Sequence, residues 1–428
     1  MRRNSSRQMT YTGLLGLLPS LPDQHPQCEG DNKHCLLFTT VPHHDGQFFK
    51  VKKSNATVTV EAGRIHGVSK GTEFTLYEAA NSSSRSFGIF TATSARSTSS
   101  KLASKNHTAS IPDVSYALVS RWGSPDATLA VFVDASSTTI LKAVSSIWKQ
   151  ATSVNIIKAS STSDADIILH DVNGGSDIVR VDSLIGGQLG TFLEKKVDVA
   201  RDRIVPILES AAHFKFHLVR TNDKHPLHGR VTIELYQLEE TDDGLLPTGS
   251  NLVDDGRARI IFSDSHYGVT LRNNSGYDLF PSLFYFNPSK FSIQPWYLPP
   301  SSTMAAPLRQ KSVLTIGHGN NDGLAIKFDL KPDDRSDTGF LVLFLSRQYA
   351  DMAPIQQSGV LDGLSARDGM VVQVDTPIWD RAHATITVAR TTEDFESRPR
   401  VVPTMATGSG SLFSTYYWRW RDWRYGGH

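Results

Sequence analysis

Cysteine is nearly absent from this sequence: the 428 residues include two, and both lie within the first 35 positions. Two cysteines cannot build a disulfide scaffold or a cysteine-based zinc site, so we expect a reducing, cytoplasmic compartment. Long hydrophobic runs are missing as well. The longest, residues 340–345, is far shorter than the roughly 20 residues that a membrane-spanning helix needs, so we expect no membrane span.

Charge of one sign is also lacking, since 44 Lys and Arg residues offset 43 Asp and Glu residues, for a net charge of +1. This balance argues against a protein that binds nucleic acid through bulk charge. Hydrophobic residues nevertheless make up 39% of the chain, which excludes wholesale disorder. At this length we expect roughly two to four domains, each with its own core.

What the sequence does contain is a succession of short β-strand patterns, which predicts a mixed, mainly β fold in five parts. The first part, residues 1–45, holds one helix pattern (10–20) and one strand pattern (35–40), too little to form a core. The second part, residues 46–125, predicts a small β-barrel of SH3-like type, with a glycine turn at 63–71. Its strand patterns are residues 48–51, 56–60, 73–77, 88–92 and 116–119.

The third part, residues 126–225, alternates strand and helix patterns and predicts a small α/β unit. We expect Pro206 to kink or shorten the second helix. Residues 214–219, Phe-Lys-Phe-His-Leu-Val, are expected to form either the last strand of the unit or the linker into the next part. The remaining patterns are strands at residues 128–133 and 166–170 and helices at residues 137–148 and 198–210.

The fourth part, residues 226–395, predicts an antiparallel β-sandwich. Its strand patterns are residues 231–236, 258–262, 267–271, 283–286, 312–316, 339–345 and 384–388. The fifth part, residues 396–428, is an aromatic and basic tail. Its composition suits stacking on bases, a protein interface, a membrane surface or packing back onto the sandwich, because Trp418, Trp420 and Trp423 alternate with Arg419, Arg421 and Arg424.

Candidates for nucleophilic catalysis are weak. Cys28 lies in Pro-Gln-Cys-Glu-Gly, but a caspase histidine should precede its cysteine by about 50 residues, and only 27 residues precede Cys28. His318 lies in Ile-Gly-His-Gly, which resembles the Ser-Gly-His-Gly motif around the catalytic histidine of caspase-like enzymes. No cysteine follows position 35, so we favour a strand end and a glycine turn for His318, and a turn or packing role for Cys28.

Metal and phosphate sites are not predicted either. His43, His44 and Asp45, with His34 nearby, are metal-ligand types, but adjacent side chains on an extended strand point to opposite faces, which favours a solvated linker. The glycines at residues 186–190 match neither phosphate-loop pattern. The acidic residues at 239–243 are expected in a solvated loop. We therefore predict no catalytic residue, no cofactor and no metal ion for this chain.

Residues 10–38, from Thr-Tyr-Thr-Gly-Leu-Leu to Cys-Leu-Leu-Phe, resemble the end of the caspase-like, metacaspase-type peptidase domain of proteins from mushroom-forming fungi (basidiomycetes). Residues 62–77 resemble the β module that follows that domain, and residues 268–347 are similar to β-sandwich domains attached to bacterial caspase-like proteins. The resemblance implies that residues 1–45 are a remnant of the peptidase domain. The family's catalytic histidine and cysteine lie upstream of this segment, so no residue here corresponds to either.

The resemblance implies a non-catalytic accessory or regulatory region of a caspase-like protein, which acts in protein recognition and has a protein partner. The alternative is part of an active caspase-type cysteine endopeptidase whose catalytic His and Cys are encoded upstream of this chain. A third class is carbohydrate or nucleic-acid binding by the sandwich or by the tail, although the near-neutral charge makes nucleic acid the less favoured ligand.

Overall fold

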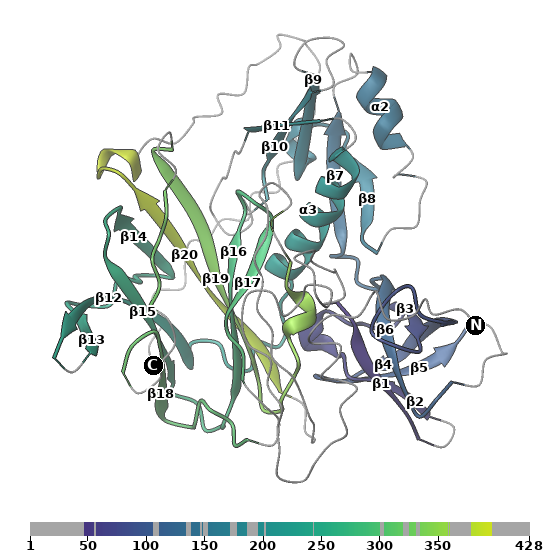
Figure 1. The fold of residues 1–428 in the computed structure, drawn as a ribbon, viewed down its shortest axis with the longest axis horizontal. Helices are drawn as coiled ribbons and strands as arrows, with labels where there is room; N and C mark the ends of the chain where they lie inside the picture. The colour runs from purple at the N-terminus through teal and green to yellow at the C-terminus, as the bar shows by residue number, and fades with distance from the viewer. Residues whose placement is uncertain are drawn as a thin grey trace, which may run out of the picture.

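A six-stranded barrel, an α/β unit and a two-sheet sandwich follow one another along the chain in the computed structural model (Figure 1), which confirms the mainly β fold. The peptidase remnant expected at residues 1–45 and the tail at 396–428 lie outside the described residues and stay predictions. The structure describes residues 47–54, 57–105, 111–133, 138–145, 148, 153–171, 178–185, 196–200, 203–242, 244–299, 304–319, 325–330, 334–357, 359 and 378–395.

The barrel closes because its first strand pairs with its last, so no strand edge is left open. The prediction of a small barrel is confirmed. The sequence pattern missed β5, Ser-Lys-Leu-Ala-Ser, because Leu102 is its one large apolar residue and three of its five residues face solvent. In spatial order the strands are β1 (Phe49–Ser54), β2 (Thr57–Val60), β5 (Ser100–Ser104), β4 (Ser86–Ala95), β3 (Glu73–Tyr77) and β6 (Val114–Arg121).

The α/β unit has a sheet that is parallel on one side and antiparallel on the other. The predicted α/β character is confirmed, although the pattern missed β8 and β10. Helix α2 (Thr138–Ser145) joins the two parallel strands β7 and β8. The spatial order is β11 (Lys196–Ala200), β10 (Ile178–Ser183), β9 (Ile167–Asp171), β7 (Thr128–Val133) and β8 (Asn155–Lys158).

The structure corrects three predictions in this unit. The helix expected at residues 198–210 starts later, because Lys196–Ala200 alternates with period two and pairs with β10 as strand β11. Helix α3 is Ile204–Val219, so residues 214–219 are helical rather than a strand or a linker. Pro206 lies in the first turn of α3, where its missing N–H costs no hydrogen bond, and the helix continues past it.

The sandwich consists of a four-stranded and a five-stranded sheet, as predicted, except that one pair, β14 and β20, is parallel. The pattern missed β13 and β17. The first sheet is β13 (Gly244–Thr248), β12 (Val231–Thr241), β15 (His266–Asn273) and β18 (Ser312–Ile316). The second sheet is β14 (Arg257–Ile261), β20 (Trp379–Ala389), β19 (Ser336–Ser346), β16 (Phe280–Asn287) and β17 (Ser292–Tyr297).

Strand β19, in the middle of the five-stranded sheet, is buried on both faces, which explains its continuous apolar run. Leu341, Leu343 and Leu345 pack into the core between the two sheets of the sandwich. Phe340, Val342 and Phe344 point to the other face and belong to a second core that is shared with the barrel and the α/β unit. The outer face of the sandwich is therefore an internal contact surface.

Helix α3 fills the space between this outer face and the other two units (Figure 1). The ring of Phe214 lies 5.5 Å from that of Phe286 and 5.7 Å from that of Phe291, both in the sandwich. Phe216 instead contacts Trp122, which follows the barrel, at 4.6 Å. We call this meeting point of α3, the barrel and the sandwich the junction. Side chains on several sides of α3 are buried there, so the helix shows no simple one-sided pattern.

Two histidines at the junction are neutral, and hydrogen bonds fix the position of their proton. The backbone N–H of Gly63 donates to Nδ1 of His66 (3.0 Å), so Nε2 carries the proton and donates to the carbonyl oxygen of Asp351 (2.9 Å). Nε2 of His213 likewise donates to the carbonyl oxygen of Ile355 (3.0 Å). Both bonds join the barrel or α3 to the segment that follows β19.

The glycine turn predicted at residues 63–71 is confirmed, and it allows a matched test of the junction. Gly67 and Gly71 both have a φ of 93°. A Cβ at Gly67 would lie 2.5 Å from the buried ring of Phe216, whereas a Cβ at Gly71 would have no heavy atom within 4 Å. Both alanine substitutions incur the strain of a positive φ. We expect Gly67→Ala to lower the free energy of unfolding by roughly 1–3 kcal/mol more than Gly71→Ala in urea titrations. Equal losses would contradict the contact.

We expect acid to lower the free energy of unfolding through the buried histidine His66 at the junction. Burial, and next the charge of Arg220, lower the pKa of His66 from 6.5 to about 3. The unfolded chain therefore binds more protons than the folded chain between these two pH values, so the stability from neutral His66 is complete above pH 6.5 and is lost as the pH falls toward 3. The loss at pH 4.5 is on the order of 3 kcal/mol. Urea titrations from pH 7 to 4.5 should show a shallower pH dependence for His66→Gln, and an unchanged one for the exposed control His228→Gln.

Candidate functional site

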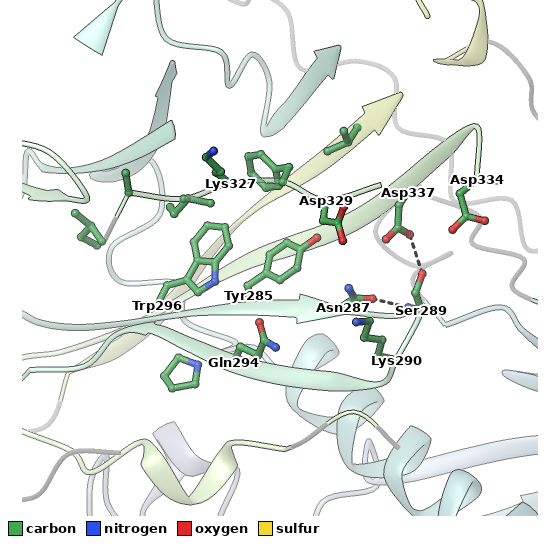
Figure 2. A pocket seen from close by; sticks show the side chains of 16 residues that line it. Tyr285, Asn287, Ser289, Lys290, Gln294, Trp296, Lys327, Asp329, Asp334 and Asp337 are labelled. Atoms are coloured by element: carbon green, nitrogen blue, oxygen red, sulfur yellow. Dashed lines mark hydrogen bonds between the residues drawn. The ribbon is translucent and has the colours of Figure 1, made fainter. Parts of the chain in front are cut away.

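A cleft of about 510 Å³ opens along one side of the sandwich, where the edge strands β17 and β18 of the two sheets leave the core uncovered. Residues 325–329 run along this opening. They are held there by Ile326, whose backbone exchanges hydrogen bonds of 2.8 and 2.9 Å with Tyr267 of β15. Figure 2 shows aromatic side chains at one end of the cleft and carboxylates at the other.

The aromatic end is a parallel stack of Tyr285 and Trp296, with ring centres 4.9 Å apart and planes inclined by 11°. Tyr285 comes from β16. Trp296 is the extra residue of a β-bulge in β17, because the register with β16 passes from Tyr297 to Pro295 without it. The bulge turns Trp296 to the same side of the sheet as Tyr297, and both pack against the sandwich core. Phe328 adds a third ring, 6.2 Å from Trp296.

Tyr285 reaches across the neighbouring strand β19 at Gly339. A Cβ at Gly339 would lie 2.2 Å from the Tyr285 hydroxyl oxygen, so only glycine leaves room for this ring. Burial, and next the negative charge of Asp337, raise the pKa of Tyr285 above its ordinary value. The phenol therefore stays protonated at physiological pH, and Figure 2 shows its hydroxyl directed toward the acidic end of the cleft.

Three carboxylates line the acidic end: Asp329, Asp334 and Asp337. Asp337 is fixed in place, since its Oδ1 accepts hydrogen bonds from Oγ of Ser289 (2.7 Å) and from the backbone N–H of Thr338 (3.0 Å). Asp329 is exposed and Asp334 is half-buried. The side chains of Asp329 and Asp334 have no hydrogen-bond or ion-pair partner among the described residues.

Basic groups at the cleft only partly balance these acids. Lys327 forms an ion pair with Asp264 outside the cleft, at 2.7 Å. Lys290 also lines the cleft. The acidic end thus combines fixed and exposed carboxylates with the amides of Asn287 and Gln294, an arrangement that accepts hydrogen bonds and attracts cations. Within the described ranges, no group of three or more His, Cys, Asp or Glu side chains is placed to hold a metal ion.

His318 occupies the strand end and glycine turn predicted for it. Strand β18 ends at Ile316, and Gly317 and Gly319 have φ angles of 79° and 69°. The ring of His318 is buried and lies 3.2 Å (Nε2) from Oγ1 of Thr270. Burial lowers the pKa of His318. The part of the chain that the structure describes contains no cysteine with which His318 could form a catalytic pair.

The acidic stretch at residues 239–243 was expected in a loop, but Glu239 and Glu240 lie near the end of β12, where they pair with β13. Glu240 is exposed, which agrees with a solvated surface. The other candidates fall outside the described residues: Cys28, His34, His43, His44, Asp45, the glycines at 186–190 and the Trp and Arg residues at 418–424. None of the cleft residues was predicted as a site from the sequence.

Comparisons with protein-family models, with curated proteins and with solved structures give no match for this chain. In the described residues, the structure contains no helix that is both long and apolar enough to cross a membrane. The cleft geometry is therefore the main guide to function.

The shape of the cleft depends on Gly339, which can be tested directly. We expect Gly339→Ala to displace the ring of Tyr285 and to lower the free energy of unfolding by roughly 1–3 kcal/mol, because both side chains cannot occupy the same space. Gly276→Ala is the control, since a Cβ there would have no heavy atom within 4 Å. Urea titrations measure the stability and near-UV circular dichroism reports the loss of the Tyr285–Trp296 stack. A variant with wild-type stability and spectrum would refute the tight packing.

Proposed function

We propose that this chain is a non-catalytic recognition module, and that its sandwich cleft binds a segment of a partner protein that carries a lysine or arginine side chain. The observation that carries the proposal is the adjacency, in one open cleft, of the Tyr285–Trp296 stack and the carboxylates of Asp329, Asp334 and Asp337. A cleft of about 510 Å³ lies within the range of protein ligand sites, roughly 300–1,000 Å³.

Each part of the cleft suits one part of such a segment. The rim of the aromatic stack supports the methylene stem of a lysine or arginine and attracts its charge through a cation–π contact. The carboxylates pair with the charged head group, and a fork of two N–H groups suits arginine best. The amides of Asn287 and Gln294 provide donors and acceptors for the backbone of an extended peptide.

Carbohydrate is the competing ligand class, because aromatic rings and carboxylates also bind sugars. A sugar needs an open aromatic face on which to stack, whereas Trp296 has Tyr285 on one side at 4.9 Å and Phe328 nearby at 6.2 Å. This arrangement favours a ligand that touches ring edges and carboxylates over one that covers a ring face. Charge gives a second argument. The lining residues include more carboxylates than lysines, and this excess of negative charge attracts a cationic ligand but not a neutral sugar.

In the wider proposal, the module serves a fungal caspase-like protein in the cytoplasm, its barrel is of SH3-like type, and residues 1–45 are a remnant of the peptidase domain. The family and the remnant rest on the resemblance of residues 10–38 and 62–77, the location rests on the scarcity of cysteine, and the barrel type rests on the spacing of the strand patterns. The alternative is part of an active caspase-type cysteine endopeptidase. Hydrolysis of peptides at Arg, Lys or Asp by the purified chain, with loss of this activity in Cys28→Ala, would contradict the recognition module and support the endopeptidase.

The binding test uses a library of fluorescent dodecapeptides that differ in their Lys and Arg content, with polarisation as the readout. We expect peptides with Lys or Arg to bind, and their versions with Gln at those positions not to bind. Asp329→Asn and Asp337→Asn should each weaken binding about tenfold, and affinity should fall as salt is added. Glu240→Gln, an exposed acid outside the cleft, should have no effect.

Two results would overturn the proposal. One is the absence of binding to any peptide of the library by a chain that circular dichroism shows to be folded. The other is tight, salt-independent binding of a neutral oligosaccharide that is lost in Trp296→Ala, which would assign the cleft to carbohydrate instead. A folded Trp296→Phe variant that keeps peptide binding would be consistent with the proposal, since phenylalanine retains the aromatic contact.

A further inference from the structure

A buried arginine lies at the junction, on the face of the five-stranded sheet opposite to the cleft. Arg220 follows the end of α3 and is 5% exposed. Its Nε donates to Nδ1 of His217 (2.9 Å), and its Nη1 donates to the carbonyl oxygen of Ile65 in η1 (Arg64–His66). Its guanidinium lies over the ring of Phe344, 4.2 Å from the ring centre. One side chain thus joins the helix, the barrel and the sandwich.

A second arginine, Arg381 on β20, flanks the same ring. The antiparallel register pairs Arg381 with Phe344 of β19, so the two side chains point to the same face of the sheet. Burial, and next the charge of Arg381, lower the pKa of Arg220, while burial lowers the pKa of Arg381 to about 10. Two positive groups are therefore held close together in a poorly solvated place, which is unfavourable without a counter-charge.

Three guanidinium nitrogen atoms of the two arginines are buried without a hydrogen-bond partner: Nη2 of Arg220, and Nε and Nη2 of Arg381. All three atoms are donors, because guanidinium nitrogens carry N–H groups and accept no hydrogen bond. Among the described residues, no Asp or Glu forms an ion pair with either arginine. The neighbouring Asp380 lies on the other face of β20, where its Oδ2 accepts the N–H of Leu227 (2.7 Å).

We propose that Arg220 and Arg381 form a binding site for a phosphate-type oxyanion at the junction. Such an anion accepts several hydrogen bonds at once and supplies the missing negative charge, and guanidinium groups match its oxygens with two N–H groups each. Arg381 is only half-buried, and His383, two residues further along the same face of β20, is exposed. The anion therefore enters past Arg381 and His383, while Arg220 lies at the base of the site.

The bound anion would hold the three units together, because its ligands come from the end of α3 and from β20, and Arg220 also contacts η1. An oxyanion of this type has two sources: free inorganic phosphate or sulfate, and the phosphoryl group of a modified side chain. The depth of Arg220 favours the small free anion. A phosphoserine peptide is therefore a separate arm of the test.

The test uses the full chain, dialysed into chloride buffer and titrated with inorganic phosphate by calorimetry. We expect saturable binding, and a Tm that rises with each tenfold increase in phosphate but not with sodium chloride of equal ionic strength. Arg381→Gln should weaken phosphate binding at least tenfold and remove the rise in Tm. Arg259→Gln, an exposed arginine on β14, should leave both unchanged. Arg381→Lys should bind with intermediate affinity, because it keeps the charge and loses the fork.

Equal effects of phosphate and chloride on the Tm would overturn the proposal, as would wild-type phosphate affinity in a folded Arg381→Gln chain. If the phosphoserine peptide binds more tightly than inorganic phosphate and Arg381→Gln abolishes its binding, the site is supported and its source is a phosphorylated side chain. If inorganic phosphate or sulfate binds and the peptide does not, the site is supported and its source is a free anion.

Discussion

The burial of helix α3 between three partners is the interaction on which the rest of the structure depends. Phe214 packs on the sandwich and Phe216 packs against Trp122 beside the barrel. At the other side of the helix, Lys215 reaches Asp166 of the α/β unit with an ion pair of 2.6 Å. Without α3, the outer face of the five-stranded sheet would expose a phenylalanine-rich surface to water, at a cost of about 25 cal/mol per Å². The barrel, the α/β unit and the outer face of the sandwich therefore share one core, while the sandwich has a second core of its own between its two sheets.

The alternation of strand β16 connects this junction with the candidate site. Phe284 and Phe286 point to the core shared with α3, while Tyr285 between them points to the cleft. The two faces of one strand thus carry the structural contact and the recognition chemistry. Displacement of β16 by even a small amount would move both, so packing at the junction holds the position of the Tyr285–Trp296 stack.

The polar groups on the two sides of the sheet follow opposite rules. At the junction, His66 is buried and neutral, and each of its ring nitrogens has a backbone partner. In the cleft, Asp329 is exposed, and Asp337 is held by Ser289 while it remains open to a ligand. Burial penalises charge on one side, and hydration permits it on the other. Arg220, which is buried, and Arg381, whose Nε and Nη2 atoms are buried, are the exception to this rule, and for that reason they point to an anion.

Strands with a regular pattern could be predicted from the sequence, and those with a weak pattern could not. The patterns at residues 73–77, 128–133 and 312–316 coincide with β3, β7 and β18. The missed strands include β13 and β17, which lie at sheet edges, where only a few side chains are buried. The cleft could not be predicted from the sequence, because its residues come from separate segments of the chain. In addition, the direction of Trp296 depends on a β-bulge that has no clear sequence pattern.

By itself, the sequence determined the order of the units, the strand faces and the glycine turns, because these follow from local alternation and from backbone angles that only glycine adopts easily. The tertiary structure decided what residues 214–219 become. Their apolar–polar alternation is that of a strand, yet they form a helix, since the space between the three units buries side chains on several sides of α3 at once. It also decided which charges are brought together, because Arg220 and Arg381, 161 positions apart, meet only when α3 packs on the sheet.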